Sequence, residues 1–163
     1  VFAYEGRYYM VLGARTLEDK GEVLVLESID KLHWNHINTL TTPEPFGYMW
    51  ECPDLFELDG ETVTEVTFSE NGQTWRYRMM PTMDVTEHIP DISGYTGGGK
   101  TAEGQVRWCA ARLCWDEGGT GCIIWKDVAP GLAYSLTVDS GATETLLNDM
   151  AQRVFQPAQG EDE

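Results

Sequence analysis

Apolar residues alternate with polar ones over much of the chain, in short runs that are separated by turn residues. The clearest case is the stretch ETVTEVTFSENGQTWRYRMM, in which Val66 and Phe68 precede the dipeptide Asn71-Gly72 and Trp75 follows it. A period of two favours a strand with one buried face, and Asn-Gly between two such runs is typical of a tight hairpin turn. The stretch therefore predicts two antiparallel strands.

Similar short runs predict further strands before and after this hairpin. They are Phe2–Tyr4, Arg7–Gly13, Glu22–Ser28, an edge strand that buries Leu32, Trp34 and Ile37, then Leu55–Leu58, Val106–Trp115, Cys122–Lys126 and Leu132–Val138. The segment between residues 81 and 105 is predicted as a loop, because it contains two prolines and the glycine cluster Gly97–Gly99.

One helix is predicted near the end of the chain, over Thr143–Phe155. Ser140 or Thr143 can cap it, and its apolar residues recur at helical spacing. These apolar residues are Leu146, Leu147, Met150 and Val154. The chain is therefore predicted to be mostly β, of the α+β class, with antiparallel sheets and a single C-terminal helix.

Composition supports a packed core and excludes one class of partner. Of the 163 residues, 42% are hydrophobic, and the formal net charge is −16. Such a charge gives no basic patch for phosphates, so nucleic acid is not expected as a partner, whereas neutral sugars are compatible. No apolar run is long enough to span a membrane. The chain opens at Val1, inside a strand-like stretch, and is expected to be part of something longer.

The four cysteines do not have the spacing of a zinc site, and we expect no metal and no cofactor. Cys114 and Cys122 flank the turn WDEGGTG symmetrically, which would place them opposite each other across a hairpin. A disulfide between them and two reduced thiols are both open. Cys109 has the wrong parity to share their face.

The candidate chemistry lies in the stretch FGYMWECPDLFELDG, in which Glu51 stands between Trp50 and the pair Cys52-Pro53. Together with VFAYEGRYYMVLGAR and ESIDKLHWNHI, this stretch makes residues 1–60 resemble the catalytic β-propeller of glycoside hydrolase family 32, the group of invertases, levanases and sucrose-6-phosphate hydrolases. The E-C-P-D motif is the most specific of the three segments.

The resemblance implies that Glu51 is the general acid/base of a retaining glycosidase acting on sucrose or fructans. Such an enzyme needs one protonated carboxyl group and one ionised nucleophile. We expect Glu51 to be buried beside Tyr48 and Trp50, which would favour the protonated form. Tyr48, Trp50, Cys52 and Asp54 are candidate substrate-binding residues, although Trp50 can equally be a core residue.

The same resemblance implies that the site is incomplete. In that family the nucleophile belongs to an N-D-P-N-type motif, and the aspartate that stabilises the transition state belongs to an R-D-P motif. Neither motif occurs in these 163 residues. We therefore expect the chain alone to be inactive.

Residues 61–163 resemble a different family, an uncharacterised C-terminal extracytoplasmic domain of bacterial anchored proteins. The resemblance is carried by the strand in QTWRYRMMPT, where that family has a tyr-x-tyr-R pattern, by the DISG turn, by the strand that ends in W-x-D, by the YSL strand and by the closing helix. Together the two resemblances predict three parts of the chain. These are a partial propeller segment over 1–60, a meandering antiparallel sheet with one helix over 61–157, and a disordered tail over 158–163.

Two function classes follow. The first is a glycosidase fragment whose partner is a fructose-containing carbohydrate, and the second is a non-catalytic extracytoplasmic domain with a structural or binding role. The first part is compatible with the cytoplasm and the second with an extracytoplasmic location. The sequence does not indicate an oligomeric state.

Overall fold

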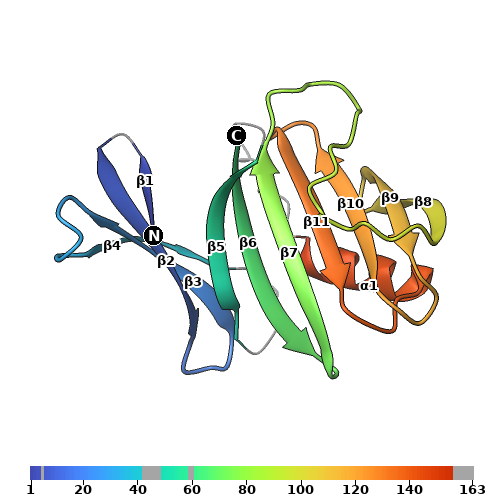
Figure 1. The fold of residues 1–163 in the computed structure, drawn as a ribbon, viewed down its shortest axis with the longest axis horizontal. Helices are drawn as coiled ribbons and strands as arrows, with labels where there is room; N and C mark the ends of the chain where they lie inside the picture. Colours follow the sequence, from blue (N-terminus) through green and yellow to red (C-terminus); the bar gives the residue numbers. More distant parts are fainter. Residues whose placement is uncertain (5, 42–48, 59–60, 156–163) are drawn as a thin grey trace, which may run out of the picture.

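The structure is a computed structural model, and it describes residues 1–4, 6–41, 49–58 and 61–155. These residues form two antiparallel sheets and one helix (Figure 1). The mostly β fold class predicted from the sequence is confirmed. The predicted tail over 158–163 lies outside the described residues. At the predicted boundary, residue 60 is also outside them, whereas residue 61 is described.

The first sheet has four strands in the order β1-β2-β3-β4. Their bounds are Phe2–Tyr4, Arg7–Arg15, Gly21–Ser28 and Asn35–Leu40. The sheet is a simple meander in which each strand pairs with the next. Among its strand residues only Gly21, Val23 and Ser28 are buried, so this sheet has little core of its own.

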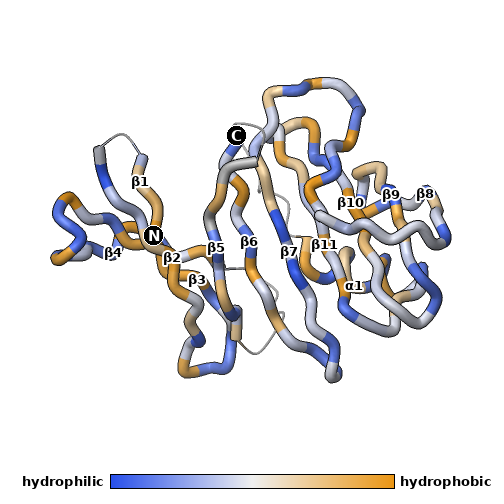
Figure 2. The backbone as a smooth tube through the Cα atoms, viewed as in Figure 1, coloured by the Kyte–Doolittle hydropathy of each residue, from blue (hydrophilic) through white to orange (hydrophobic). Residues whose placement is uncertain are grey.

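The second sheet has seven strands in the order β5-β6-β7-β11-β10-β9-β8. Their bounds are β5 Glu51–Leu58, β6 Glu61–Glu70, β7 Gln73–Pro81, β8 Lys100–Val106, β9 Cys109–Trp115, β10 Gly121–Asp127 and β11 Leu132–Val138. The predicted hairpin at Asn71-Gly72 is confirmed as β6 and β7, which are paired from Glu70 and Gln73 outward. Hydrophobic and hydrophilic residues alternate along several of these strands, and hydrophilic residues lie at several of the turns (Figure 2).

Helix α1, Glu144–Val154, packs on one face of this sheet, against β8 to β11 (Figure 1). Thr143 caps it, since its side chain accepts a hydrogen bond from the amide of Leu146. Of the two predicted caps the structure therefore uses Thr143. Leu147, Met150 and Val154 are buried as predicted, and Leu146 is half-buried.

A long connection over residues 82–99, here called the strap, crosses the opposite face of the sheet (Figure 1). Three basic side chains from three strands bind its carbonyl groups. Arg78 donates to Ile92, Arg112 to Ile89, and Lys126 to Thr86. With the helix on one face and the strap on the other, every residue of β10 is buried.

Four local predictions were wrong. The predicted edge strand begins only at Asn35, as β4, and neither Leu32 nor Ile37 is buried, since they are 80% and 50% exposed. The glycine-rich stretch includes a strand, β8, and the long predicted strand at Val106–Trp115 divides at Arg107, whose φ of 51° turns the chain. Strand β5 pairs with β6, so the E-C-P-D segment belongs to the second sheet and not to the first.

Candidate active site

Glu51 is the first residue of β5, at the edge of the seven-stranded sheet. It pairs with Thr67 of β6, and the register then shifts before Asp54 pairs with Glu65. The shift is a β-bulge, which adds a residue to one strand and redirects the side chains around it. The E-C-P-D motif thus occupies a bulge at the start of a strand.

The two central residues of the motif account for the bulge. Cys52 has a φ of 46°, in the left-handed region that a residue with a side chain rarely adopts. Pro53 has no amide hydrogen for the ladder, and an edge strand or a bulge is where a sheet accepts it. The backbone between Glu51 and Asp54 is therefore fixed by local chemistry.

Glu51, Cys52 and Asp54 are exposed. The predicted burial of Glu51 beside Trp50 is wrong, because the bulge leaves the Glu51 side chain open to solvent. Tyr48, the other predicted neighbour, lies outside the described residues. The catalytic role of Glu51 and the substrate-binding roles of Tyr48, Trp50, Cys52 and Asp54 stay predictions.

Trp50 is buried, with 5% of its surface exposed, and belongs to the main core. Its indole ring lies against Gly21, and its carbonyl oxygen lies against Gly13, so closely that neither glycine leaves room for a Cβ atom. Trp50 is therefore the side chain that packs the four-stranded sheet against the seven-stranded one. Of its two predicted roles, the structure shows the core role.

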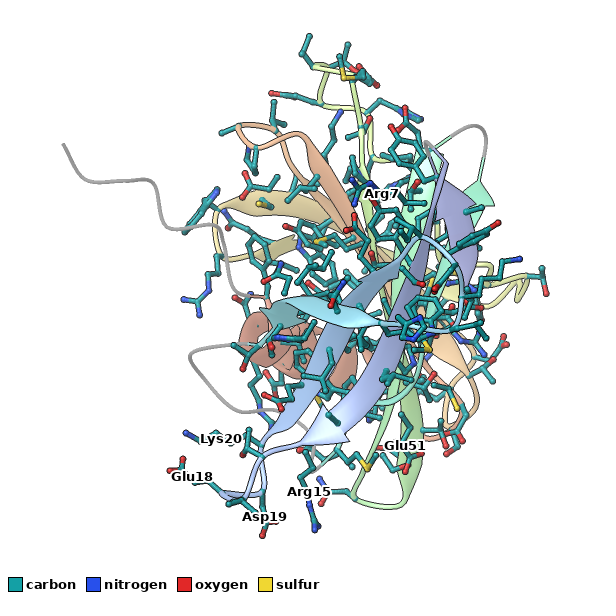
Figure 3. The ribbon with its side chains drawn as sticks, turned by 90° about the vertical axis from the view of Figure 1, so that its left-hand side faces the viewer. Arg7, Arg15, Glu18, Asp19, Lys20 and Glu51 are labelled. Atoms are coloured by element: carbon teal, nitrogen blue, oxygen red, sulfur yellow. The ribbon has the colours of Figure 1, made fainter. Side chains whose placement is uncertain are left out.

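The β2–β3 turn lies at the same end of the molecule as Glu51 (Figure 3). The turn is charged, and its side chains pair with one another. Arg15 lies 3.5 Å from Asp19, and Lys20 lies 3.2 Å from Glu18. Arg7, which pairs with Glu27 at 2.6 Å, lies far along the sheet from this end (Figure 3). The sequence interpretation singled out none of these charged residues.

An apolar cavity of about 290 Å³ lies between the two sheets, with Trp50 among its walls. Leu40, Val66, Tyr77 and Val154 are among the residues that line it. Among the described residues that line it, none carries a charged side chain. The sequence pattern could not reveal it, since its walls come from both sheets and the helix.

Cys114 and Cys122 are direct partners in the β9–β10 ladder, as predicted. Cys109 faces the helix side instead, where it joins the main core. All four cysteines are free thiols in the structure. Burial raises the pKa of Cys109 and of Cys122 to about 11. The disulfide between Cys114 and Cys122 stays a prediction.

Within the described part of the chain, no three His, Cys, Asp or Glu side chains are grouped so that they could hold a metal ion. The same residues include no helix that is both long and apolar enough to cross a membrane.

Residues 1–110 match the family described as Glycosyl hydrolases family 32 N-terminal domain. The match covers more than half of the chain, and the chain therefore belongs to this family. The match continues past residue 60, where the predicted propeller segment ends. The second predicted resemblance, to an extracytoplasmic domain over 61–163, has no counterpart among these matches.

Curated relatives are sucrose-6-phosphate hydrolases. A probable sucrose-6-phosphate hydrolase of Vibrio cholerae is 51% identical over 59 residues, which are 35% of this chain and 11% of the relative. The sucrose-6-phosphate hydrolase of Bacillus subtilis is 40% identical over 72 residues, which are 41% of this chain and 15% of the relative. The chain thus matches only about a tenth to a seventh of the length of these enzymes.

Among solved structures, a mutant β-fructofuranosidase from Bombyx mori in complex with sucrose has 22% sequence identity to this chain. The TM-score is 0.42, and the match covers 84% of this chain and 32% of the silkworm enzyme.

Proposed function

We propose that this chain is a catalytically incomplete part of a retaining glycoside hydrolase that acts on sucrose or fructans. Glu51 is its general acid/base. The observation that carries the proposal is the E-C-P-D motif, which forms an exposed, bulged strand start in a chain of family 32. An exposed carboxyl group at a rigid position is accessible to a glycosidic oxygen.

Each residue of the motif has a role in this proposal. Glu51 donates a proton to the leaving oxygen and later takes one from water. Cys52 and Pro53 fix its backbone through the bulge. Asp54, which is exposed on the same strand, orients the turn and contributes to substrate binding together with Tyr48. The substrate is a carbohydrate that contains fructose.

A proton donor does not complete the reaction by itself. Without a carboxylate nucleophile no glycosyl-enzyme intermediate forms, and the 163 residues contain neither the N-D-P nor the R-D-P motif. The isolated chain is therefore expected to leave sucrose intact.

Fructose release from sucrose and from inulin by the purified chain tests this proposal, with Glu51→Gln as the paired variant. We expect no release above a buffer control for either protein. If the unaltered chain released fructose and Glu51→Gln abolished that release, the site would be complete, which would contradict the proposal.

A non-catalytic extracytoplasmic domain is the second candidate, and the location of the core favours it. The main core is built mostly by β6 to β11 and α1, and the predicted catalytic residue is not part of it. The parent reading frame discriminates between the two. N-D-P and R-D-P motifs upstream of Val1 favour the enzyme, and a lipobox or a membrane span favours the domain.

A further inference from the structure

A cavity of about 400 Å³ lies at the end of β10, remote in sequence from the E-C-P-D motif. It is lined by the strap, by the β8–β9 turn and by the chain that leaves β10. The lining side chains that carry charge or aromatic character are Glu87, Trp108, Lys126 and Asp127.

Asp127 is the feature that requires explanation. It is 5% exposed, and no hydrogen bond or ion pair within the described residues satisfies its carboxylate. The carboxylate oxygens are not among the fully enclosed polar atoms that lack a partner, so they are reached from solvent, and Asp127 lines this cavity. A largely buried carboxylate without a protein partner is satisfied by water or by a ligand on its open side. Its carboxylate lies close enough to Cys109 and to Tyr134 to contribute, after burial, to raising their pKa values.

Lys126, the nearest cation along the chain, is engaged elsewhere. Its Nζ atom donates to the carbonyl oxygen of Thr86 at 2.7 Å and to that of His88 at 3.3 Å, and lies 3.8 Å from Asp84. Because its side chain is only 1% exposed, it is fixed on the strap. Neighbouring residues of a strand point to opposite faces, so Lys126 and Asp127 do not neutralise each other.

Trp108 provides an open aromatic surface at the same cavity. It is 62% exposed, which is unusual for a tryptophan, and it packs edge-on against Phe155 with ring centroids 6.2 Å apart. The preceding residue is tied to the end of the helix, since the amide of Arg107 donates to Gln152 at 2.9 Å. The indole is therefore held in place although most of it faces solvent.

We propose that this cavity binds an organic cation, a substituted ammonium or guanidinium group, between the carboxylate of Asp127 and the indole of Trp108. A carboxylate supplies the charge-assisted hydrogen bonds, and an aromatic face attracts a cation through its quadrupole. Glu87 adds a second negative charge at the rim. This site is independent of the proposed glycosidase function.

A cation fits the cavity better than a neutral hydroxylated ligand. The carboxylate of Asp127 is an acceptor, whereas the charged donor of the lining, Lys126, already binds the strap carbonyls. The net charge of −16 also attracts cations to the molecule. The cation has two sources, a free small amine or an arginine or lysine side chain of another protein.

Titration of the ¹⁵N-labelled chain with methylguanidinium and methylammonium tests the site, with the indole signal of Trp108 as the readout. Trp108→Phe assigns that signal. We expect saturable shifts that neutral methylurea does not produce. Asp127→Asn should weaken binding by about tenfold or more, the effect of losing a hydrogen bond to a charged group. Asp149→Asn, which removes an exposed carboxylate on α1, is the control and should change the affinity less than about twofold.

Two capped tripeptides, Gly-Arg-Gly and Gly-Gln-Gly, distinguish the sources. Tighter binding of the arginine peptide than of methylguanidinium supports a protein partner, and binding of the small ions alone supports a free amine. The proposal is overturned if no cation shifts the Trp108 signal, if methylurea shifts it equally, or if a folded Asp127→Asn protein, checked by its unfolding midpoint, binds as tightly as the unaltered chain.

Discussion

At the residue scale, two glycines determine how the candidate active site is attached to the rest of the molecule. Gly13 and Gly21 lie on neighbouring strands of the first sheet, and both face Trp50, the residue before Glu51. Because they lack a Cβ atom, the backbone of β2 approaches the strand that carries the E-C-P-D motif. The position of Glu51 therefore depends on two residues that lie 38 and 30 positions earlier in the chain.

Gly13→Ala should destabilise the protein by about 1–3 kcal/mol, because the added methyl group would overlap the carbonyl oxygen of Trp50 and lie 3.2 Å from Pro53 Cδ. Urea unfolding measures the change in the free energy of unfolding. Gly98→Ala is the matched control, since a Cβ atom there meets nothing within 4 Å. Equal stability of the two variants would contradict the close packing at Gly13.

The raised pKa values of the buried thiols predict an order of labelling. Cys52 is exposed and should react first with iodoacetamide at pH 8, whereas Cys109 and Cys122 should react slowly. For these two the thiolate is the reactive form, so their labelling rate should rise about tenfold per pH unit until it levels off near a pKa of about 11. Peptide mapping by mass spectrometry gives each rate, with labelling in urea as the control.

Labelling of Cys114 and Cys122 only after reduction, in unfolded protein, would instead show the disulfide that the sequence left open. The two residues are paired across β9 and β10, so such a bond is geometrically accessible.

The sequence locates the candidate site by resemblance, but it does not predict that Glu51 is exposed. The letters E-C-P-D identify Glu51 by resemblance, and the spacing predicts the pairing of Cys114 with Cys122. The exposure of Glu51 follows from the left-handed backbone of Cys52, which the sequence does not reveal. Asp127 and Trp108 were missed because their significance depends on tertiary contacts between β10, the strap and the helix end.

At the element scale, the strands were easier to predict than their partners. Alternation and the Asn-Gly turn predict β6 and β7 correctly, since both signals are local. Strand β8 was missed because the glycine-rich stretch before it is typical of a loop. Its pairing with β9, from Lys100 with Trp115 to Val106 with Cys109, stabilises it despite its composition.

Thr143→Ala should lower the free energy of unfolding by about 1 kcal/mol, through loss of the cap at the start of α1. Ser140→Ala removes the other residue that the sequence offered as a cap and should have a smaller effect. Thermal or urea unfolding of the two variants measures the difference. A larger loss for Ser140→Ala would contradict the observed capping by Thr143.

At the scale of the whole molecule, the two sheets differ in how well they are buried. The seven-stranded sheet is covered on both faces and contains most of the main core. The four-stranded sheet contributes Val23 to that core and leaves Leu12 42% exposed. The four-stranded sheet therefore has little core of its own.

Amide hydrogen exchange should therefore be faster in β2 and β3 than in β10 and β11. Regions with few buried apolar contacts open at lower free energy than the global unfolding. Exchange monitored by mass spectrometry on peptides from these strands measures the difference. Equal protection of both sheets would show that they unfold as one cooperative unit.

The central claim is that Glu51 is the acid/base of a family 32 site whose other carboxylates are not in this chain. The most direct test places residues 1–58 in a complete enzyme, the sucrose-6-phosphate hydrolase of Vibrio cholerae, in exchange for the corresponding segment, to which this chain is 51% identical over 59 residues. The measurement is kcat/KM for sucrose 6-phosphate. We predict an active hybrid in which Glu51→Gln lowers kcat/KM by about 10²–10⁴-fold, the usual contribution of a general acid/base, whereas Glu18→Gln in the exposed β2–β3 turn leaves it nearly unchanged. An active hybrid that keeps its full activity after Glu51→Gln would contradict the account.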